Sequence, residues 1–152
     1  MEVSRIFVAG SGTMGNGIAQ VAATSGYQVT LMDVIPAQLE IAKANISKSV
    51  DKLLEKKQIT HEQKNNVLNI QTVTSLESVP EADLVVEAVS ENPEIKLRVF
   101  AELDQLARPG VILASNTSSI SITKIASATK RSELVIGMHF MNPVPLMRLV
   151  EV

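Results

Sequence analysis

Short apolar runs alternate along the chain with longer stretches in which apolar residues recur every three or four positions. The short runs are typical of buried strands, and the longer ones, such as that carrying Leu39, Ala42 and Ile46, are typical of amphipathic helices. The predicted strands cover residues 3–9, 28–32, 70–73, 84–89, 111–114, 134–138 and 147–152. The predicted helices cover residues 12–25, 36–57, 60–68, a stretch from Pro93 to before Pro109, and 122–126.

Strands that alternate with helices in this order predict an α/β fold of the Rossmann type. Such a fold is a doubly wound, mostly parallel sheet with helices on both faces and right-handed crossovers. Its ligands lie beyond the carboxyl ends of the strands. The segments to examine for function are therefore those that follow strands, namely Asp33, 89–92, 115–119 and 139–143.

A glycine-rich turn, Gly10-Ser-Gly12-Thr-Met-Gly15, joins the first predicted strand to the first helix. Gly10 permits a tight turn, Gly12 leaves room for a pyrophosphate to approach the backbone, and Gly15 lets the helix pack closely on the strand. The helix N-terminus offers free N–H groups and partial positive charge to phosphates. The turn, with Thr13 and Met14, is therefore predicted to bind a dinucleotide. The alternative is a tight strand-to-helix turn without a ligand.

Asp33 closes the second predicted strand, where a carboxylate accepts hydrogen bonds from ribose hydroxyls and would repel a 2′-phosphate. This placement predicts NAD rather than NADP as the cofactor. The competing interpretation is that Asp33 is a surface acid that helps to start the next helix.

Composition narrows the classes of function. The chain of 152 residues is 45% hydrophobic but 3% aromatic, so its core is aliphatic, and its formal charge of −2 does not indicate a nucleic-acid partner. No apolar run approaches the roughly 20 residues of a membrane span. The absence of cysteine excludes disulfides, thiolate metal sites and a thiol nucleophile, so we expect no metal and a cytoplasmic location. Because an apolar stretch closes the chain, we expect residues 1–152 to be one domain of a longer two-domain protein.

His139 and Glu151 are candidates for acid–base chemistry. His139 follows the sixth predicted strand, and Glu151 lies in the next one after a proline-containing turn, so neighbouring strands would bring the two together. A carboxylate on one ring nitrogen fixes the tautomer and stabilises the imidazolium, which suits a base that removes a hydroxyl proton. The alternatives are a structural histidine and a surface acid that pairs with Arg148.

Two further polar clusters follow strands. Residues 115–119 read Ser-Asn-Thr-Ser-Ser, from which a hydroxyl would donate to a substrate oxygen. The alternative is a helix-capping loop, which these residue types favour. Glu91 and Asn92 precede Pro93, and their alternative role is also to cap a helix.

Ser49, Lys52 and Lys56 share one stripe of the helix predicted over residues 36–57. The stripe is either a solvated face or a cationic rail for a phosphorylated part of the substrate.

Four segments together resemble the L-3-hydroxyacyl-CoA dehydrogenase family, including its bacterial branch that acts on 3-hydroxybutyryl-CoA. They are residues 8–20 with the glycine turn, 83–92, 114–119, and 137–152, which opens Gly-Met-His-Phe-Met-Asn-Pro. The last two are specific to the family, whereas the glycine turn alone is not. The resemblance implies NAD as the cofactor and the interconversion of (S)-3-hydroxyacyl-CoA and 3-ketoacyl-CoA.

The resemblance also implies a role for individual residues. The catalytic set it implies is His139 as base, Glu151 as the carboxylate that orients it, Ser118 on the substrate's 3-oxygen, and Asn142 beside the nicotinamide. The cofactor set is Asp33 at the adenosine ribose, with Glu91, Lys96 and Asn116 lining the NAD cleft. Ser49 and Lys56 would contact coenzyme A.

Members of that family continue into a helical C-terminal domain that forms the dimer and closes over the substrate. We therefore expect this chain to bind NAD, to be weakly active or inactive alone because water is not excluded, and to belong to a homodimer when full length. A non-catalytic NAD-binding or scaffold module is the alternative. A third interpretation, a dehydrogenase of free hydroxy acids, is disfavoured by the two family-specific segments.

Overall fold

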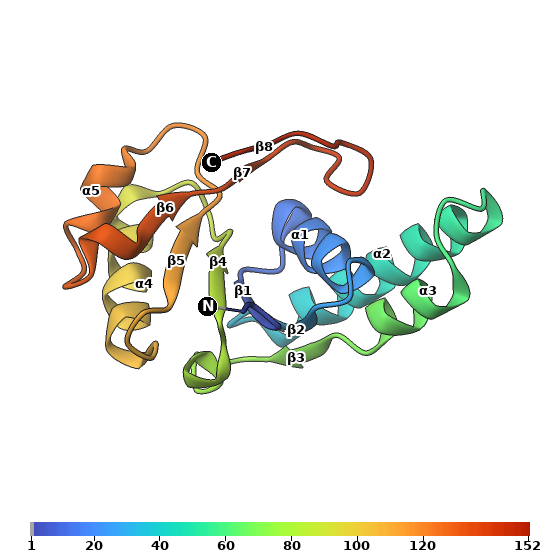
Figure 1. The fold of residues 1–152 in the computed structure, drawn as a ribbon, viewed down its shortest axis with the longest axis horizontal. Helices are drawn as coiled ribbons and strands as arrows, with labels where there is room; N and C mark the ends of the chain where they lie inside the picture. Colours follow the sequence, from blue (N-terminus) through green and yellow to red (C-terminus); the bar gives the residue numbers. More distant parts are fainter. Residues whose placement is uncertain (1) are drawn as a thin grey trace.

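Six parallel strands form the central sheet of the computed structural model, which describes residues 2–152 (Figure 1). Their order across the sheet is β3-β2-β1-β4-β5-β6. The chain adds β2 and β3 on one side of β1, and then β4, β5 and β6 on the other side. This topology confirms the predicted doubly wound Rossmann sheet. The strands are β1 Arg5–Ala9, β2 Gln28–Met32, β3 Gln71–Val73, β4 Leu84–Glu87, β5 Ile112–Ser115 and β6 Val135–Gly137.

Helices cover both faces of the sheet, with α1, α2 and α3 on one side and α4 and α5 on the other (Figure 1). Thr60 and Gln63 form a capping box at the start of α3, because the Thr60 side chain accepts from the Gln63 amide and the Gln63 side chain accepts from the Thr60 amide. Asn92 caps α4 by accepting from two backbone amides in its first turn. The bounds are α1 Thr13–Thr24, α2 Pro36–Glu55, α3 His61–Leu68, α4 Pro93–Leu106, α5 Ile122–Ala126, and the short helices η1 Val79–Glu81 and η2 Ser132–Leu134.

Two apolar cores lie on opposite faces of the sheet. The core that faces α1 and α2 contains Val8, Leu31 and Val86. The core on the side of α4 and α5 contains Phe7, Val85 and Leu113, together with the fully buried Phe100.

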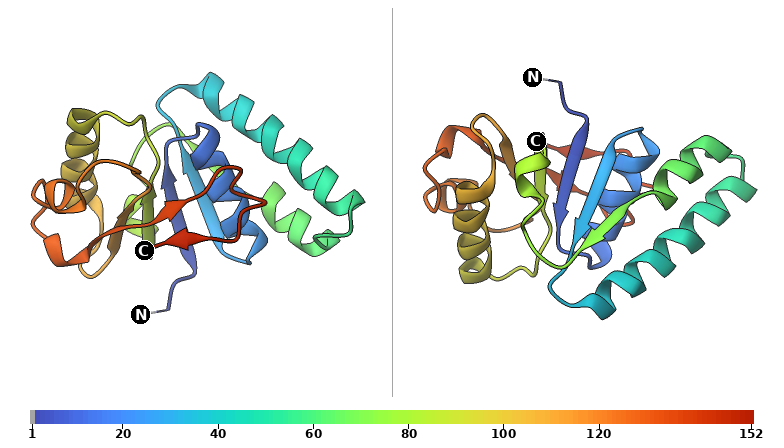
Figure 2. Two further views of the ribbon diagram at one scale, coloured as in Figure 1. Left: turned by 90° about the horizontal axis from the view of Figure 1, so that it is seen from above. Right: turned by 90° about the horizontal axis from the view of Figure 1, so that it is seen from below.

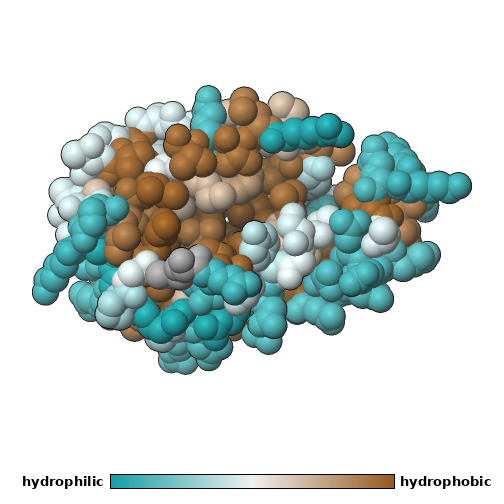
Figure 3. All heavy atoms as spheres, viewed as in Figure 1, coloured by the Kyte–Doolittle hydropathy of each residue, from teal (hydrophilic) through white to brown (hydrophobic). Residues whose placement is uncertain are grey.

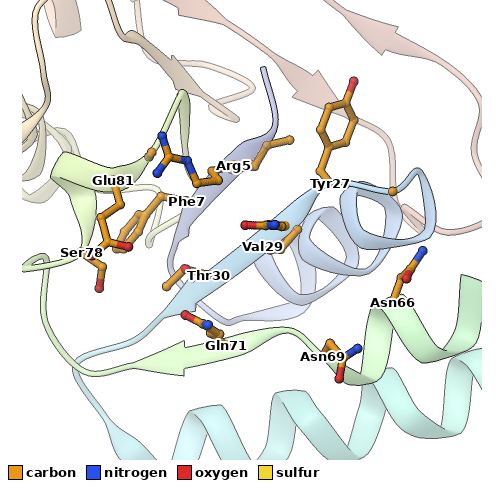
Figure 4. Close-up of a pocket in the computed structure, with 14 residues that line it drawn as sticks. Arg5, Phe7, Tyr27, Val29, Thr30, Asn66, Asn69, Gln71, Ser78 and Glu81 are labelled. Carbon is orange, nitrogen blue, oxygen red and sulfur yellow. The ribbon is translucent and has the colours of Figure 1, made fainter. Parts of the chain in front are cut away.

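One corner of the sheet has no helical cover among the described residues. The β3–β4 connection contains only η1, so β1, β2 and β3 are open on the side seen from below (Figure 2, right). Polar side chains such as Thr30 and Gln71 line a cleft of about 470 Å³ there, together with Arg5 and Glu81 (Figure 4). The cleft begins at the first residues of these strands, the edge opposite to the carboxyl ends where such sheets bind ligands.

A two-stranded hairpin follows the sheet and was not predicted as such. The strands β7 (His139–Phe140) and β8 (Val150–Glu151) pair antiparallel, outside the six-stranded sheet. The predicted strand 147–152 is therefore wrong in extent, because a turn closed by hydrogen bonds from Leu146 and Met147 to Pro143 holds the preceding residues. The hairpin crosses over the side of the sheet that carries α1 (Figure 2, left). Phe140 and Val144 complete the core on that face.

Candidate cofactor and active site

The glycine turn between β1 and α1 is dictated in part by the packing of the protein itself. Gly10 has φ +101°, and a Cβ at this position would lie 2.6 Å from the Ala88 carbonyl oxygen. A Cβ at Gly15 would lie 1.8 Å from the Gly10 oxygen. Neither position tolerates a side chain, so these two glycines set the close approach of α1 to the sheet.

Gly12 differs, since nothing in the described chain requires a glycine there. It has φ −61° as the N-cap of α1, and a Cβ would meet no atom within 4 Å. No side chain caps the helix, so the first-turn N–H groups, beginning at Thr13 and Met14, have no capping partner beside the open space at Gly12. This cradle, which a Cβ would fill, fits a pyrophosphate held by the helix N-terminus.

Asp33 braces the same turn. One carboxylate oxygen accepts from the Ser11 amide at 3.0 Å and its hydroxyl at 2.8 Å, and the other accepts from the Ile35 amide at 3.0 Å. Both interpretations of Asp33 are therefore compatible, because a carboxylate has roughly four lone-pair sites and can also accept from a ribose hydroxyl.

Two exposed apolar residues beside Asp33 were missed by sequence reasoning. Val34 and Ile35 are 72% and 52% exposed between the carboxylate and the start of α2. Beside a carboxylate that is predicted to bind a ribose, an apolar surface is suited to an adenine ring. The available signal was the pair of apolar residues placed between an acid and Pro36, outside any strand.

The hairpin places His139 directly opposite Glu151. The two residues are register partners in β7 and β8, and the His139 Nδ1 lies 2.9 Å from the Glu151 Oε2. An ionised carboxylate only accepts hydrogen bonds, so Nδ1 carries the proton and Nε2 is left as the basic nitrogen. The imidazole side chain is 29% exposed and can be reached from solvent.

Ser118 lies with this pair. A hollow of about 400 Å³ is lined by Ser118, His139 and Glu151, together with the glycine that ends β6. The structure thus brings three predicted catalytic residues to one place beyond the carboxyl ends of β5 and β6. Asn142, the fourth, is exposed in the hairpin turn and does not line this hollow.

Asn116 ties the serine loop to the hairpin. Its side-chain oxygen accepts from the Phe140 amide at 2.8 Å, and the Met138 amide donates to the Ser115 carbonyl at 2.8 Å. The loop after β5 and the strand carrying His139 are therefore fastened together on both sides of the imidazole.

Glu91 and Lys96 lie beside the loop but differ in exposure. The Glu91 side chain is 43% exposed, whereas that of Lys96 is 1% exposed. The Lys96 Nζ lies 2.6 Å from Glu87 and 3.6 Å from Glu91, so both carboxylates already pair with it. Its contact with a cofactor stays a prediction. Partial burial alone would raise the pKa of Glu91, but hydrogen bonds from Thr117 and Ser119 and the charge of Lys96 lower it.

Ser49 and Lys56 lie away from this hollow. The Ser49 hydroxyl accepts from the buried Gln20 amide at 2.9 Å, and Lys56 is exposed at the end of α2. Gln20 lines a second cleft, of about 670 Å³, between α1, the segment after α2 and the hairpin turn.

Residues 2–152 contain no candidate metal site and no candidate membrane span. No group of three or more acidic or histidine side chains is arranged to hold a metal ion. No helix in the same range is long and apolar enough to cross a membrane.

A family model described as the NAD binding domain of 3-hydroxyacyl-CoA dehydrogenase matches residues 5–152. The chain belongs to this family. It is 45% identical over 150 residues to the 3-hydroxybutyryl-CoA dehydrogenase of Bradyrhizobium diazoefficiens, covering 98% of this chain and 51% of that protein. It is 44% identical over 149 residues to the enzyme of that name from Clostridioides difficile, covering 97% and 53%.

Crystal structures of family members share the fold. The Escherichia coli 3-hydroxybutyryl-CoA dehydrogenase superimposes with TM-score 0.94 at 42% identity, covering 99% of this chain and 32% of that one. The (S)-3-hydroxybutyryl-CoA dehydrogenase of Ralstonia eutropha gives TM-score 0.93 at 41% identity, covering 98% and 53%. The chain spans about half the length of these two curated relatives. As a member of the 3-hydroxyacyl-CoA dehydrogenase NAD-binding domains, it is assigned NAD as its cofactor.

Proposed function

We propose that this chain is the cofactor-binding half of a dehydrogenase that interconverts (S)-3-hydroxyacyl-CoA, chiefly 3-hydroxybutyryl-CoA, and 3-ketoacyl-CoA. The observation that carries the proposal is the 2.9 Å pair of His139 and Glu151, in one hollow with Ser118. A cofactor-binding module without catalysis has no need for an oriented imidazole beside a hydroxyl donor.

The proton chemistry follows from the orientation of the imidazole. Ser118 donates a hydrogen bond to the 3-oxygen of the substrate, and the His139 Nε2 takes the hydroxyl proton as the carbonyl forms. Glu151 holds the Nδ1 proton at 2.9 Å and stabilises the imidazolium. The chemistry that bound NAD would supply here is a hydride acceptor for carbon 3. In the reverse reaction the imidazolium returns its proton to the 3-oxygen.

The hairpin surface supports a further domain in the whole protein. Leu146, Met147, Leu149 and Val152 are 47–87% exposed along it, and hydrophobic side chains reach the surface at the top of the molecule in Figure 3. Contiguous exposed apolar side chains mark surfaces that other protein covers. The proposed second domain closes this surface, excludes water from the imidazole and forms a homodimer, which analytical ultracentrifugation of the full-length protein would detect.

Ser49 and Lys56 are proposed to contact coenzyme A, with the ammonium group facing a phosphate. Reversing the charge at Lys56 should raise KM for acetoacetyl-CoA and leave kcat nearly unchanged, because the contact is far from the reacting carbon. An unchanged KM would indicate that this face of the helix is only a solvated surface. Lys43, exposed and paired with Glu40 on the same helix, provides the matched charge reversal.

A chimera tests the proposal as a whole. This chain replaces the matching half of the Ralstonia eutropha enzyme, which it covers over 53% of its length. NADH oxidation dependent on acetoacetyl-CoA is expected from the chimera, and much less or none from the chain alone, although both bind NADH. A chimera that folds and binds NADH but shows no turnover would contradict the catalytic proposal. It would favour the alternative, a cofactor-binding module without catalysis.

The location in the cell is proposed to be the cytoplasm. Immunodetection in separated cytoplasmic and membrane fractions checks this directly.

A further inference from the structure

A buried ion pair lies beneath the candidate site and has no direct part in the proposed proton transfer. Glu87 ends β4 with its side chain 0% exposed, and Lys96 in α4 is 1% exposed. Their charged atoms are 2.6 Å apart. Desolvation makes such a pair costly, and apolar residues of similar volume often stabilise a protein as well or better. Stability alone therefore does not explain the pair, and its hydrogen-bond partners indicate another role.

The Glu87 carboxylate joins three segments of chain. One oxygen accepts from Lys96 and from the Val89 amide at 2.7 Å, and the other accepts from the Ser115 hydroxyl at 2.6 Å. These partners lie in α4, in the segment after β4 and at the end of β5. Lys96 in turn donates to the Val89 carbonyl at 3.2 Å and faces Glu91.

The second carboxylate, Glu91, holds the serine loop on both sides of Ser118. It accepts hydrogen bonds from the hydroxyls of Thr117 and Ser119. The Thr117 hydroxyl also accepts from the amides of Ser119 and Ile120 at 3.3 and 3.0 Å. Ser118 is exposed, whereas its neighbours Thr117, Ser119 and Ile120 are all held by these hydrogen bonds.

The same network reaches the imidazole. Ser115, bound through its side chain to Glu87, accepts through its carbonyl from the Met138 amide next to His139. Glu87 is therefore connected by one residue to the Ser118 loop and by two to His139.

We propose that Glu87 is a positioning residue, which, with Lys96, sets the Ser118 loop and the spacing between the Ser118 hydroxyl and the His139 imidazole. The link to catalysis rests on the proposed function, whereas the effect on the loop does not. Lys96 acts on the site through Glu87 and Glu91. Losing Glu87 alone leaves Lys96 buried with only the more distant Glu91.

The double variant Glu87→Gln with Lys96→Met tests this in the chimera with the Ralstonia eutropha enzyme. It removes both buried charges together, so it keeps the protein folded, whereas the single Glu87→Gln leaves the buried Lys96 charge with only Glu91, 3.6 Å away. Hydrogen exchange at the amides of Thr117, Ser119 and Ile120 is expected to be about tenfold faster than in the parent. We also expect kcat to fall by about 10- to 100-fold, with a smaller change in KM, because a misplaced donor mainly affects the transition state.

The matched control is Asp104→Asn with Arg131→Met, which removes a second, partly buried ion pair that joins α4 to a residue after α5. That pair fixes the C-terminal end of the helix, with Nε and Oδ1 2.7 Å apart. This control variant should have a lower melting temperature, with hydrogen exchange in the Ser118 loop and kcat unchanged. A folded Glu87→Gln, Lys96→Met variant with parental loop exchange would overturn the proposal. If the parent chimera itself is inactive, the proposed function fails, but the exchange measurement still decides the role of Glu87 in the loop.

Discussion

Gly17 of α1 and Val144 of the hairpin turn touch so closely that a Cβ at Gly17 would lie 2.8 Å from the Val144 Cβ. Val144 is 4% exposed and belongs to the core formed by α1 and the sheet. The helix that begins at the glycine turn is thus in direct contact with the hairpin that carries His139 and Glu151. The close approach of these two elements depends on the absence of a side chain at residue 17.

Gly17→Ala should lower the free energy of unfolding by about 1–3 kcal/mol, because the Val144 side chain and its turn must shift to make room. Urea denaturation of the chain measures the change. Gly12→Ala is the control, since a Cβ there meets no atom within 4 Å and the backbone φ of −61° suits alanine. Equal stability of the two variants would show that the turn moves freely away from α1.

Gly12→Ala should, however, weaken NAD binding, because its methyl group occupies the room left for the pyrophosphate at the start of α1. We expect a loss of affinity of about tenfold or more, on the scale of one lost hydrogen bond to a charged group. Isothermal titration calorimetry with NAD measures it on the chain alone. An unchanged dissociation constant would place the pyrophosphate elsewhere.

Asp33→Ala should weaken NAD binding by about 1–3 kcal/mol, the range for losing a hydrogen bond to a charged group. Because Asp33 also accepts from Ser11 and Ile35, part of the loss could come from a loosened turn. Ser11→Ala removes the hydroxyl contact and keeps the carboxylate, so it separates the two causes. Calorimetric affinity of Asp33→Ala equal to that of the parent would remove the residue from the cofactor site.

Asp83 should make the protein lose stability in acid. Hydrogen bonds from the side chain and backbone of Arg5 and from Ser4 hold the pKa of the Asp83 carboxyl far below its usual range. Arg108 lies 2.7 Å from the same carboxylate. A lowered folded-state pKa gives stability that is fully present above the unfolded pKa of about 3.9 and is lost as the pH falls below it.

Asp83→Asn should therefore be less stable than the parent at neutral pH, and the difference should shrink as the pH is lowered through about 4 toward 2. Urea denaturation over this pH series measures both proteins. A constant difference at every pH would mean that the charge of Asp83 contributes nothing to the pH dependence.

The strand-to-helix patterns could be predicted because each was encoded locally. The run from β1 through Gly10 to α1 joins a buried strand, a left-handed glycine and a helix start within a few residues. The capping box at Thr60 is similarly local. By contrast, β7 has two residues, too few for any periodicity, and exists because the chain turns back at Pro143 to pair with β8.

The candidate site was predictable where its residues follow strands and not where burial decides their role. His139 and Glu151 could be paired from their order along the chain, and the register of the hairpin brings them together. Helical periodicity does not distinguish Lys96 from a solvated helix lysine, since its burial depends on pairing with the Glu87 side chain. Likewise, the contact of Val144 with Gly17 joins residues far apart in sequence.

The central claim is that His139 is the base of a dehydrogenase whose cofactor half is this chain. The most direct measurement compares His139→Gln with the parent in the chimera, using acetoacetyl-CoA turnover by NADH oxidation and NADH affinity by fluorescence. The account predicts turnover lower by about 10²- to 10⁴-fold, the range for loss of a general acid–base, with NADH affinity unchanged. Turnover of the variant close to that of the parent would contradict it.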